Sequence, residues 1–231
     1  MVEIYLVRHG KTMFNTIGRT QGWCDTPLTA AGEEGIVELG LGLKAENICF
    51  DRAYSSDSGR TIQTLMLILE HSENLGIPHT MDRRIREWCF GSFEGGYDHE
   101  LFDGVLPRLF VEEGLKKGVI PSYEEIARSI KAADSAGWAE DWQTLSGRLM
   151  TGFTDIAKEA EREGAQNIVV VSHSMSICTF LSLLLPGGNT PRDLENGSVT
   201  RLTWTDGKFS VGEMGDTHYR ATGREILDKQ K

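Results

Sequence analysis

The sequence predicts an α/β protein in which helices cover both faces of a mostly parallel central sheet. Short runs rich in β-branched residues alternate with amphipathic helical segments, which is typical of parallel sheets built from strand–helix–strand units. The clearest buried strand is 167–172, and an apolar helix is expected directly after it, over 175–185. An Asp206-Gly207 pair between two strand-like runs predicts a terminal hairpin, which would make the sheet mixed.

The amino-terminal half supplies the first strands and helices. Residues 2–7 form a β-branched and aromatic run that ends at Arg8-His9-Gly10, and 50–55 is a second strand candidate. Thr29 is expected to cap a helix that ends near Glu46. Asp57 or Ser58 should cap the apolar helix that follows, and 79–82 is a short strand candidate.

The middle of the chain is less regular. Residues 87–97 are rich in glycine and aromatic side chains and are interpreted as a loop, whereas about 97–137 is interpreted as a helical cap inserted into the sheet domain. Residues 138–163 then repeat apolar positions every three or four residues, which predicts one long amphipathic helix. The prediction is a three-layer α/β/α fold, with residues 1–231 forming one domain that carries the cap.

Composition limits the partners. Acidic residues outnumber basic ones by 34 to 24, a net charge of −10, which argues against nucleic acid or an anionic membrane as a partner. The longest aliphatic run, 65–69, is too short to span a bilayer, and no secretory leader is recognised, so the protein is expected to be cytoplasmic. Cys49 and Cys178 are interpreted as reduced thiols in the core. The expected assembly is a monomer or a homodimer.

Two histidines occupy equivalent positions in the predicted sheet. His9, preceded by Arg8, follows the first strand, and His173 follows the strand 167–172. Ligands of α/β sheets bind beyond the carboxyl ends of the strands, so these side chains are expected to meet there. Arg60 lies in the first turn of the helix after the second strand, where free amides and a guanidinium can hold an anion. An acidic protein needs such a local cationic cluster to bind an anionic substrate.

Five ordered segments extend this pattern over most of the chain. The sequence resembles the histidine phosphatase superfamily, which includes the cofactor-dependent phosphoglycerate mutases. The resemblance is carried by Arg8-His9-Gly10-Lys11-Thr12, Gln21-Gly22-Trp23-Cys24-Asp25-Thr26-Pro27-Leu28-Thr29, Ser55-Ser56-Asp57-Ser58-Gly59-Arg60-Thr61, Glu87-Trp88-Cys89-Phe90-Gly91-Ser92-Phe93-Glu94-Gly95 and Val171-Ser172-His173. This resemblance implies the phosphoglycerate mutase-like fold.

The resemblance also implies the chemistry of the site. His9 would be the nucleophile and form a phosphohistidine, with its other ring nitrogen held by a hydrogen bond to the backbone. Arg8, Arg60 and His173 would neutralise the phosphoryl oxygens, so neither a metal nor a cofactor would be required. Glu87 would be the general acid and base, with a pKa raised by partial shielding.

The remaining polar residues of these segments have less defined functions. Glu94 is a competing candidate for the general acid but is interpreted as structural. Asn15, Gln21 and Gly22 would line the phosphate and the substrate. Ser174 departs from the family pattern, which has glycine after the second histidine, and could crowd the phosphate or donate a hydrogen bond to it.

The predicted function is hydrolysis of a small phosphorylated metabolite by a phosphatase. A phosphoglycerate mutase-type isomerase is the alternative, although the basic residues in 94–136 are scattered and do not match the mutase insertion. A non-catalytic phospholigand-binding protein is a second alternative. A metallohydrolase is disfavoured because no HxH or HExxH spacing occurs.

Overall fold

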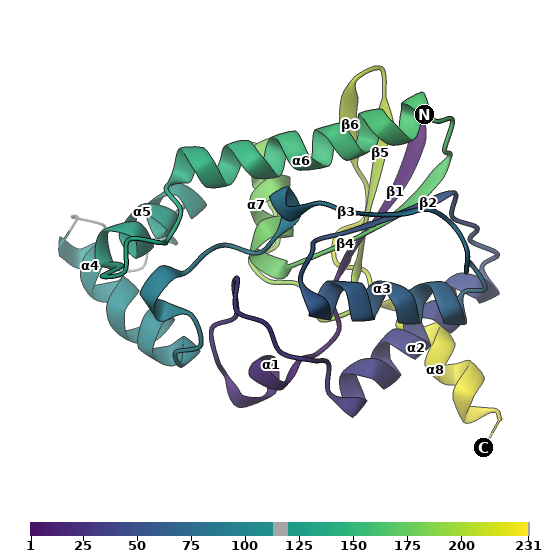
Figure 1. Cartoon of the computed structure of the whole chain (residues 1–231), viewed down its shortest axis with the longest axis horizontal. Helices are drawn as coiled ribbons and strands as arrows, with labels where there is room; N and C mark the ends of the chain where they lie inside the picture. Colours follow the sequence, from purple (N-terminus) through teal and green to yellow (C-terminus); the bar gives the residue numbers. More distant parts are fainter. Residues whose placement is uncertain (113–119, 231) are drawn as a thin grey trace.

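The computed structural model describes residues 1–112 and 120–230 and contains a six-stranded mixed sheet (Figure 1). The strand order is β3-β2-β4-β1-β5-β6, with parallel pairing among the first four and antiparallel pairing of β5 with β1 and β6. The predicted mostly parallel sheet with a terminal hairpin is confirmed. The strands are β1 Val2–Arg8, β2 Arg52–Ser55, β3 His79–Met81, β4 Asn167–Ser172, β5 Val199–Thr205 and β6 Lys208–Val211.

Helices cover both faces of the sheet, as Figure 1 shows, with α6 and α7 on one side and α2, α3 and α8 on the other. The predicted three-layer α/β/α architecture is therefore confirmed. The helices are α1 Met13–Ile17, α2 Ala30–Ala45, α3 Gly59–His71, α4 Leu106–Glu112, α5 Tyr123–Ala133, α6 Trp142–Arg162, α7 Ser174–Leu184 and α8 His218–Asp228. Among these described helices, none has both the length and the apolar character that spanning a bilayer requires.

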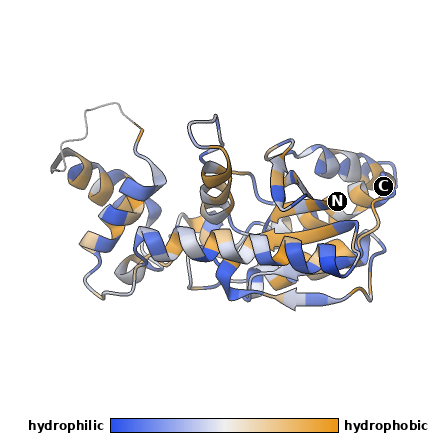
Figure 2. Cartoon of the chain, turned by 90° about the horizontal axis from the view of Figure 1, so that it is seen from above, coloured by the Kyte–Doolittle hydropathy of each residue, from blue (hydrophilic) through white to orange (hydrophobic). Residues whose placement is uncertain are grey.

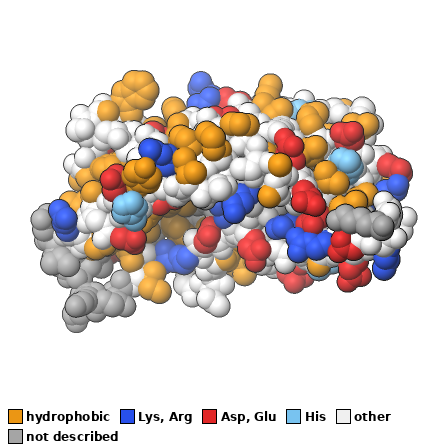
Figure 3. All heavy atoms as spheres, turned by 90° about the horizontal axis from the view of Figure 1, so that it is seen from below, with side chains coloured by type: hydrophobic (Ala, Val, Ile, Leu, Met, Phe, Trp, Pro, Cys, Tyr) orange, Lys and Arg blue, Asp and Glu red, His pale blue; other side chains and the backbone are white. Residues whose placement is uncertain are grey.

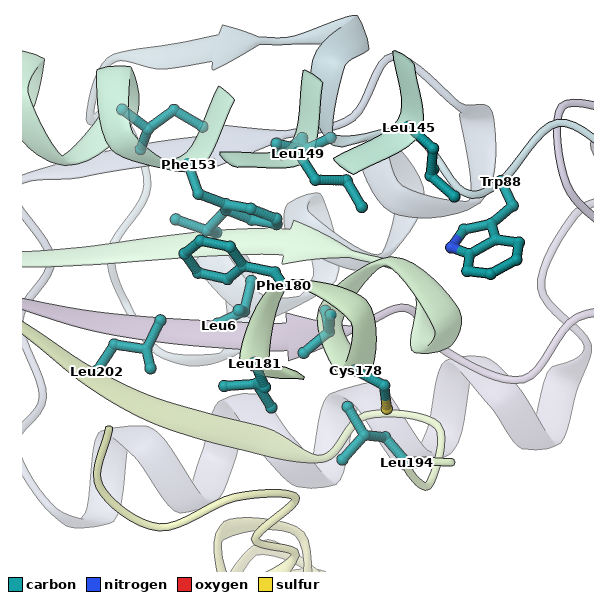
Figure 4. Close-up of a cluster of buried hydrophobic side chains, with 14 of the residues drawn as sticks. Leu6, Trp88, Leu145, Leu149, Phe153, Cys178, Phe180, Leu181, Leu194 and Leu202 are labelled. Carbon is teal, nitrogen blue, oxygen red and sulfur yellow. The ribbon is translucent and has the colours of Figure 1, made fainter. Parts of the chain in front are cut away.

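The alternation of side chains along β1 divides the core into two apolar layers. Ile4 and Leu6 face α6 and α7, where Phe153 and Phe180 stack with ring centroids 4.3 Å apart (Figure 4). Tyr5 and Val7 point to the opposite side and pack with residues of α2 and α3. Figure 2 shows the strands largely in orange and the helices banded in orange and blue, as expected for amphipathic helices around a buried sheet.

Local sequence signals set most element ends. The Thr29 side chain caps α2 by accepting from the Gly32 amide, as predicted, and Ser58 is the N-cap residue of α3. The long helix α6 begins four residues later than predicted, because the Asp141 carboxylate accepts from the Thr144 amide and so fixes the first turn. The Asp206-Gly207 turn has positive φ at both residues, as a tight hairpin requires.

The inserted cap is helical where it is described. It consists of a π-helical segment, Glu100–Val105, followed by α4 and α5, while residues 113–119 of the predicted cap lie outside the described residues. Leu101, Leu106 and Ile130 of the cap are buried in the same apolar cluster as Leu6 of β1. The cap is thereby packed onto the α6–α7 side of the sheet.

Two sequence interpretations need correction or completion. Cys178 is buried as expected, but Cys49 is exposed, because it lies in the connection before β2 and the next residue, Phe50, enters the core instead. The segment after Gly215 has no element predicted from the sequence. It forms α8, which packs along α2.

The α2–α8 contact depends on missing side chains. A Cβ atom on Gly42 would lie 1.8 Å from the Tyr219 carbonyl oxygen, and one on Gly223 would lie 1.8 Å from the Glu38 carbonyl oxygen. Glycine at both positions lets the two helix backbones touch, which a larger residue would prevent.

Gly223→Ala should therefore lower the free energy of unfolding by about 3 kcal/mol, because the helices must separate. The matched control is Gly147→Ala in α6, where a Cβ meets nothing within 4 Å and helix propensity should raise stability by about 0.5–1 kcal/mol. Chemical denaturation measures both. Equal effects of the two substitutions would refute the close-contact explanation.

Candidate active site

The two histidines meet at the carboxyl edge of the sheet. Arg8 ends β1 and pairs in register with Ser172, the last residue of β4, so the residues that follow these strands emerge side by side. The rings of His9 and His173 have centroids 5.2 Å apart and an interplanar angle of 64°. The predicted convergence of the two imidazoles is present.

His9 is held in one orientation. Its Nδ1 lies 2.8 Å from the Gly10 carbonyl oxygen, which can only accept, so Nδ1 carries the proton and Nε2 keeps its lone pair. Burial, followed by the charges of Arg60 and Arg8, holds the pKa of His9 well below its ordinary value of 6.5. His9 is therefore a neutral imidazole with a free nitrogen, as a nucleophile must be.

His173 is the N-cap residue of α7 and is fully buried. Its Nε2 lies 2.8 Å from the Ser56 hydroxyl, and its Nδ1 accepts from the Arg60 guanidinium. The Thr61 hydroxyl donates to the carbonyl oxygens of Ser56 and Ser58, so its oxygen can accept from the Ser56 hydroxyl. With its own proton used in this way, the Ser56 hydroxyl oxygen can accept from Nε2 of His173. Burial and the positive charge of Arg60 keep the pKa of His173 well below 6.5.

Arg60 is the buried centre of the site. Its guanidinium donates to Asp25 at 2.8 Å, to the carbonyl oxygens of Cys24 and Gly22 at 3.0 and 2.8 Å, and to Nδ1 of His173. Arg60 has no exposed surface, so its guanidinium is buried among these partners. Its charge is satisfied by one carboxylate and by the loop that precedes α2.

Arg8 lies at the open side of His9. One guanidinium nitrogen donates to Asp193 at 2.9 Å and to the Leu194 carbonyl oxygen, whereas Nε is buried without a hydrogen-bond partner among the described residues. Ser174 takes part in this arrangement, because its hydroxyl donates to Asp193 at 2.7 Å and accepts from the Leu194 amide. Ser174 thus holds the segment that orients Arg8.

Glu87 is buried beside the amino terminus of α7. Its carboxylate accepts from the backbone amides of Trp88, Met175 and Ser176 and from the Ser176 hydroxyl, at 2.9 to 3.1 Å. These donors favour the ionised form, but burial outweighs them and raises the pKa of Glu87 above its ordinary value of 4.5. A carboxyl with a raised pKa keeps its proton to a higher pH than an exposed carboxyl, which suits a general acid.

Glu94 has a different environment. Its two carboxylate oxygens accept from the amides of Gly22, Trp23, Cys24 and Phe90, so they are fully used in holding the 22–24 loop. This arrangement supports the structural interpretation of Glu94. A Cβ atom on Gly22 would lie 2.1 Å from the Trp88 carbonyl oxygen, so glycine at this position serves loop packing.

A cavity of about 510 Å³ opens in front of His9. Arg8, His9, Asn15, Gln21 and Glu87 line it, whereas Arg60, His173 and Gly22 do not. The cap and neighbouring segments supply the remainder of the lining, which includes Arg19, Phe90, Asp98, Phe102, Tyr123, Met175 and Arg192.

The face of the molecule shown in Figure 3 carries acidic and basic side chains interspersed, so the net charge of the protein does not form one acidic surface there.

Some residues of the site were not predicted. Asp25 and Ser56 lie within the segments that carry the family resemblance. Their contacts with Arg60 and His173 join residues that are distant in the chain, so a single sequence does not predict them. Asn196 comes from a loop without any motif, and its amide donates to the His9 carbonyl oxygen at 3.0 Å. Over the described ranges, no group of three or more His, Cys, Asp or Glu side chains is arranged to hold a metal ion.

The fold and this arrangement of two histidines define a phosphoryl-transfer enzyme. The family model described as histidine phosphatase superfamily (branch 1) matches residues 4–105 and 111–217, so the chain belongs to this superfamily. A broad-specificity phosphatase of Saccharomyces cerevisiae is 27% identical over 237 residues, with 98% of this chain and 91% of that protein covered.

Solved structures agree with this assignment. A crystal structure of phosphoglycerate mutase from Bacillus anthracis superposes with a TM-score of 0.88 at 39% identity, covering 96% of each chain. A phosphoserine phosphatase of Entamoeba histolytica, crystallised with 3-phosphoglyceric acid, shares the fold with a TM-score of 0.69 at 24% identity, covering 95% of this chain and 100% of that one. The predicted phosphoglycerate mutase-like fold is confirmed.

The low pKa of His9 has a measurable consequence. In an NMR titration of the ring, His9 should stay neutral at pH 6.5 and protonate only at lower pH, and Arg60→Met should raise its pKa because a nearby cation is lost. A midpoint at or above 6.5 in the unmodified protein would contradict this electrostatic description.

The lowered pKa values also affect stability. In the unfolded chain His9 and His173 bind protons more readily than in the folded protein, so the free energy of unfolding should fall as pH drops below 6.5.

Proposed function

We propose that the protein is a phosphatase that hydrolyses phosphomonoesters of small metabolites through a phosphohistidine on His9. The observation that carries the proposal is the hydrogen bond from Nδ1 of His9 to Gly10, which leaves Nε2 unprotonated inside a cavity that Arg8 and Glu87 also line. A neutral nucleophile, a cation and a carboxyl with a raised pKa are the groups that such a transfer needs.

In the first step, Nε2 of His9 attacks phosphorus and the bond to the leaving oxygen breaks. Glu87 gives its proton to that oxygen, so the product leaves as a neutral alcohol. Arg8, whose side chain lines the cavity beside His9, stabilises the phosphoryl oxygens through its positive charge. Arg60 and His173 act from buried positions near His9, which let them orient the ring and stabilise negative charge.

In the second step, water attacks the phosphohistidine. Glu87, now ionised, takes a proton from the water as the phosphorus–nitrogen bond breaks, and phosphate leaves with His9 restored as a neutral imidazole. Splitting the reaction into two displacements lowers each barrier. Asn15 and Gln21, which line the same cavity, would contact the phosphate or the substrate.

Glu87→Gln should lower kcat/KM by about 100-fold for alkyl phosphates, whose leaving oxygen needs a proton. The loss should be much smaller for 4-nitrophenyl phosphate, because nitrophenolate leaves without protonation. Steady-state phosphate release measures both, and His9→Ala, which should abolish turnover of each substrate, is the reference. Equal losses with the two substrates would show that Glu87 is not the general acid.

The mutase alternative rests on the similarity to the Bacillus anthracis phosphoglycerate mutase at 39% identity. Against it, the basic residues in 94–136 do not match the mutase insertion, and a broad-specificity phosphatase is similar over 98% of this chain. The phosphatase is therefore the preferred assignment.

Incubation with 3-phosphoglycerate and a bisphosphoglycerate primer separates the two activities. Phosphate release should exceed isomerisation, and the ratio should not change when more primer is added. Isomerisation faster than phosphate release, measured by NMR of the phosphorus signals, would make the protein a mutase.

The small size of the expected substrate and the cytoplasmic location belong to the same proposal. The cationic groups beside His9 suit an anionic metabolite, and the acidic composition disfavours nucleic acid and anionic membranes as partners.

A further inference from the structure

The two oxygens of the Glu87 carboxylate have unequal environments. Oε1 accepts three hydrogen bonds, from the Trp88 amide at 3.0 Å and from the amide and the hydroxyl of Ser176, both at 2.9 Å. Among the described residues, Oε2 accepts only one, from the Met175 amide at 3.1 Å. A carboxylate oxygen with three donors has little remaining capacity, so Oε2 is the oxygen available to a reacting group.

The Ser176 hydroxyl has one proton and two acceptors. It lies 2.9 Å from Oε1 of Glu87 and 2.8 Å from the Arg86 carbonyl oxygen, and Ser176 is completely buried. An ionised carboxylate is the stronger acceptor, whereas a neutral carboxyl competes less well with the backbone carbonyl. The hydroxyl can therefore turn towards Glu87 when it is ionised and towards Arg86 when it is protonated.

We propose that Ser176 is a positioning residue for Glu87: its hydroxyl anchors Oε1 and leaves Oε2 to exchange the proton with the leaving group and with water. This inference rests on the function proposed above for Glu87. The buried hydroxyl donates to Glu87 while the carboxylate is ionised and to the Arg86 carbonyl oxygen while Glu87 is protonated, so only the hydroxyl proton has to move during the reaction.

Charged and titratable groups around Glu87 come from several elements. Arg60 of α3 favours the ionised carboxylate through its charge, and the Cys178 thiol of α7 is close enough to Glu87 to interact with it electrostatically. Arg148 of α6 donates to the Glu87 backbone carbonyl, not to its carboxylate, and His9 and Arg8 lie on the same cavity. Among the described residues, Ser176 is the only one whose side-chain hydroxyl donates to the Glu87 carboxylate.

The sign of the effect follows from the contact. The hydroxyl stabilises the ionised form, so Ser176→Ala should raise the pKa of Glu87 by about one unit. The protonated acid then persists to higher pH, and the descending limb of kcat/KM for an alkyl phosphate should move upward by the same amount.

The direct test is a titration of the Glu87 side-chain carboxyl carbon by NMR, with the signal assigned by its absence in Glu87→Gln. Ser182→Ala is the matched control, because it removes a hydroxyl from the same helix that donates to the Thr179 carbonyl oxygen, not to Glu87. Ser176→Ala should shift the midpoint upward, and Ser182→Ala should leave it unchanged. Ser176→Thr, which keeps the hydroxyl, should return the midpoint towards that of the unmodified protein.

The kinetic profile is measured on the same variants with an alkyl phosphate. An unshifted Glu87 midpoint in a folded Ser176→Ala protein would overturn the inference. A shifted midpoint with an unchanged kinetic limb would instead contradict the catalytic function proposed for Glu87, so the two failures are distinguishable. If Ser176→Ala does not fold, the same titration of Ser176→Cys, whose thiol is a weaker donor, should still show an upward shift, and its absence overturns the inference.

Discussion

The buried guanidinium of Arg60 is the interaction on which the rest of the site depends. Removing such a cation from water costs several kcal/mol, roughly, unless its donors are satisfied. Asp25, the carbonyl oxygens of Gly22 and Cys24, and His173 satisfy them. These partners come from a loop before α2 and from the junction of β4 and α7, so Arg60 joins distant parts of the chain. Burial lowers the pKa of both histidines, and the charge of Arg60 lowers it further.

The sheet places the chemistry around this cation. The parallel pairing of β1 with β4 brings the segments after both strands to one edge, and the amino terminus of α7 starts at the same point. The donors at that helix end hold the Glu87 carboxylate, while burial keeps its pKa raised. The site thus contains a neutral imidazole, His9, which is the proposed nucleophile, and a carboxyl with a raised pKa, and each state has a separate structural cause.

Much of this could be predicted from the sequence. The run 167–172 and the Asp206-Gly207 turn gave correct strands because apolar periodicity and turn chemistry are local. The convergence of His9 and His173 followed from the rule that strand ends meet at one edge. The tail helix α8 was missed because its contact with α2 depends on paired glycines, Gly42 and Gly223, whose partners are distant in sequence. The deep burial of Arg60 likewise depends on Asp25, which no spacing links to it.

The most direct test of the account is capture of the phosphoenzyme. Rapid quenching at alkaline pH during turnover of a phosphomonoester, followed by mass spectrometry of the peptides, should locate one phosphoryl group on His9. The modification should be lost on acid treatment, as expected for a phosphorus–nitrogen bond, and should be absent from His9→Ala. The account would be contradicted if the enzyme turned over substrate but no phosphorylated His9 was found at any quench time. A phosphoryl group on another residue would contradict it equally.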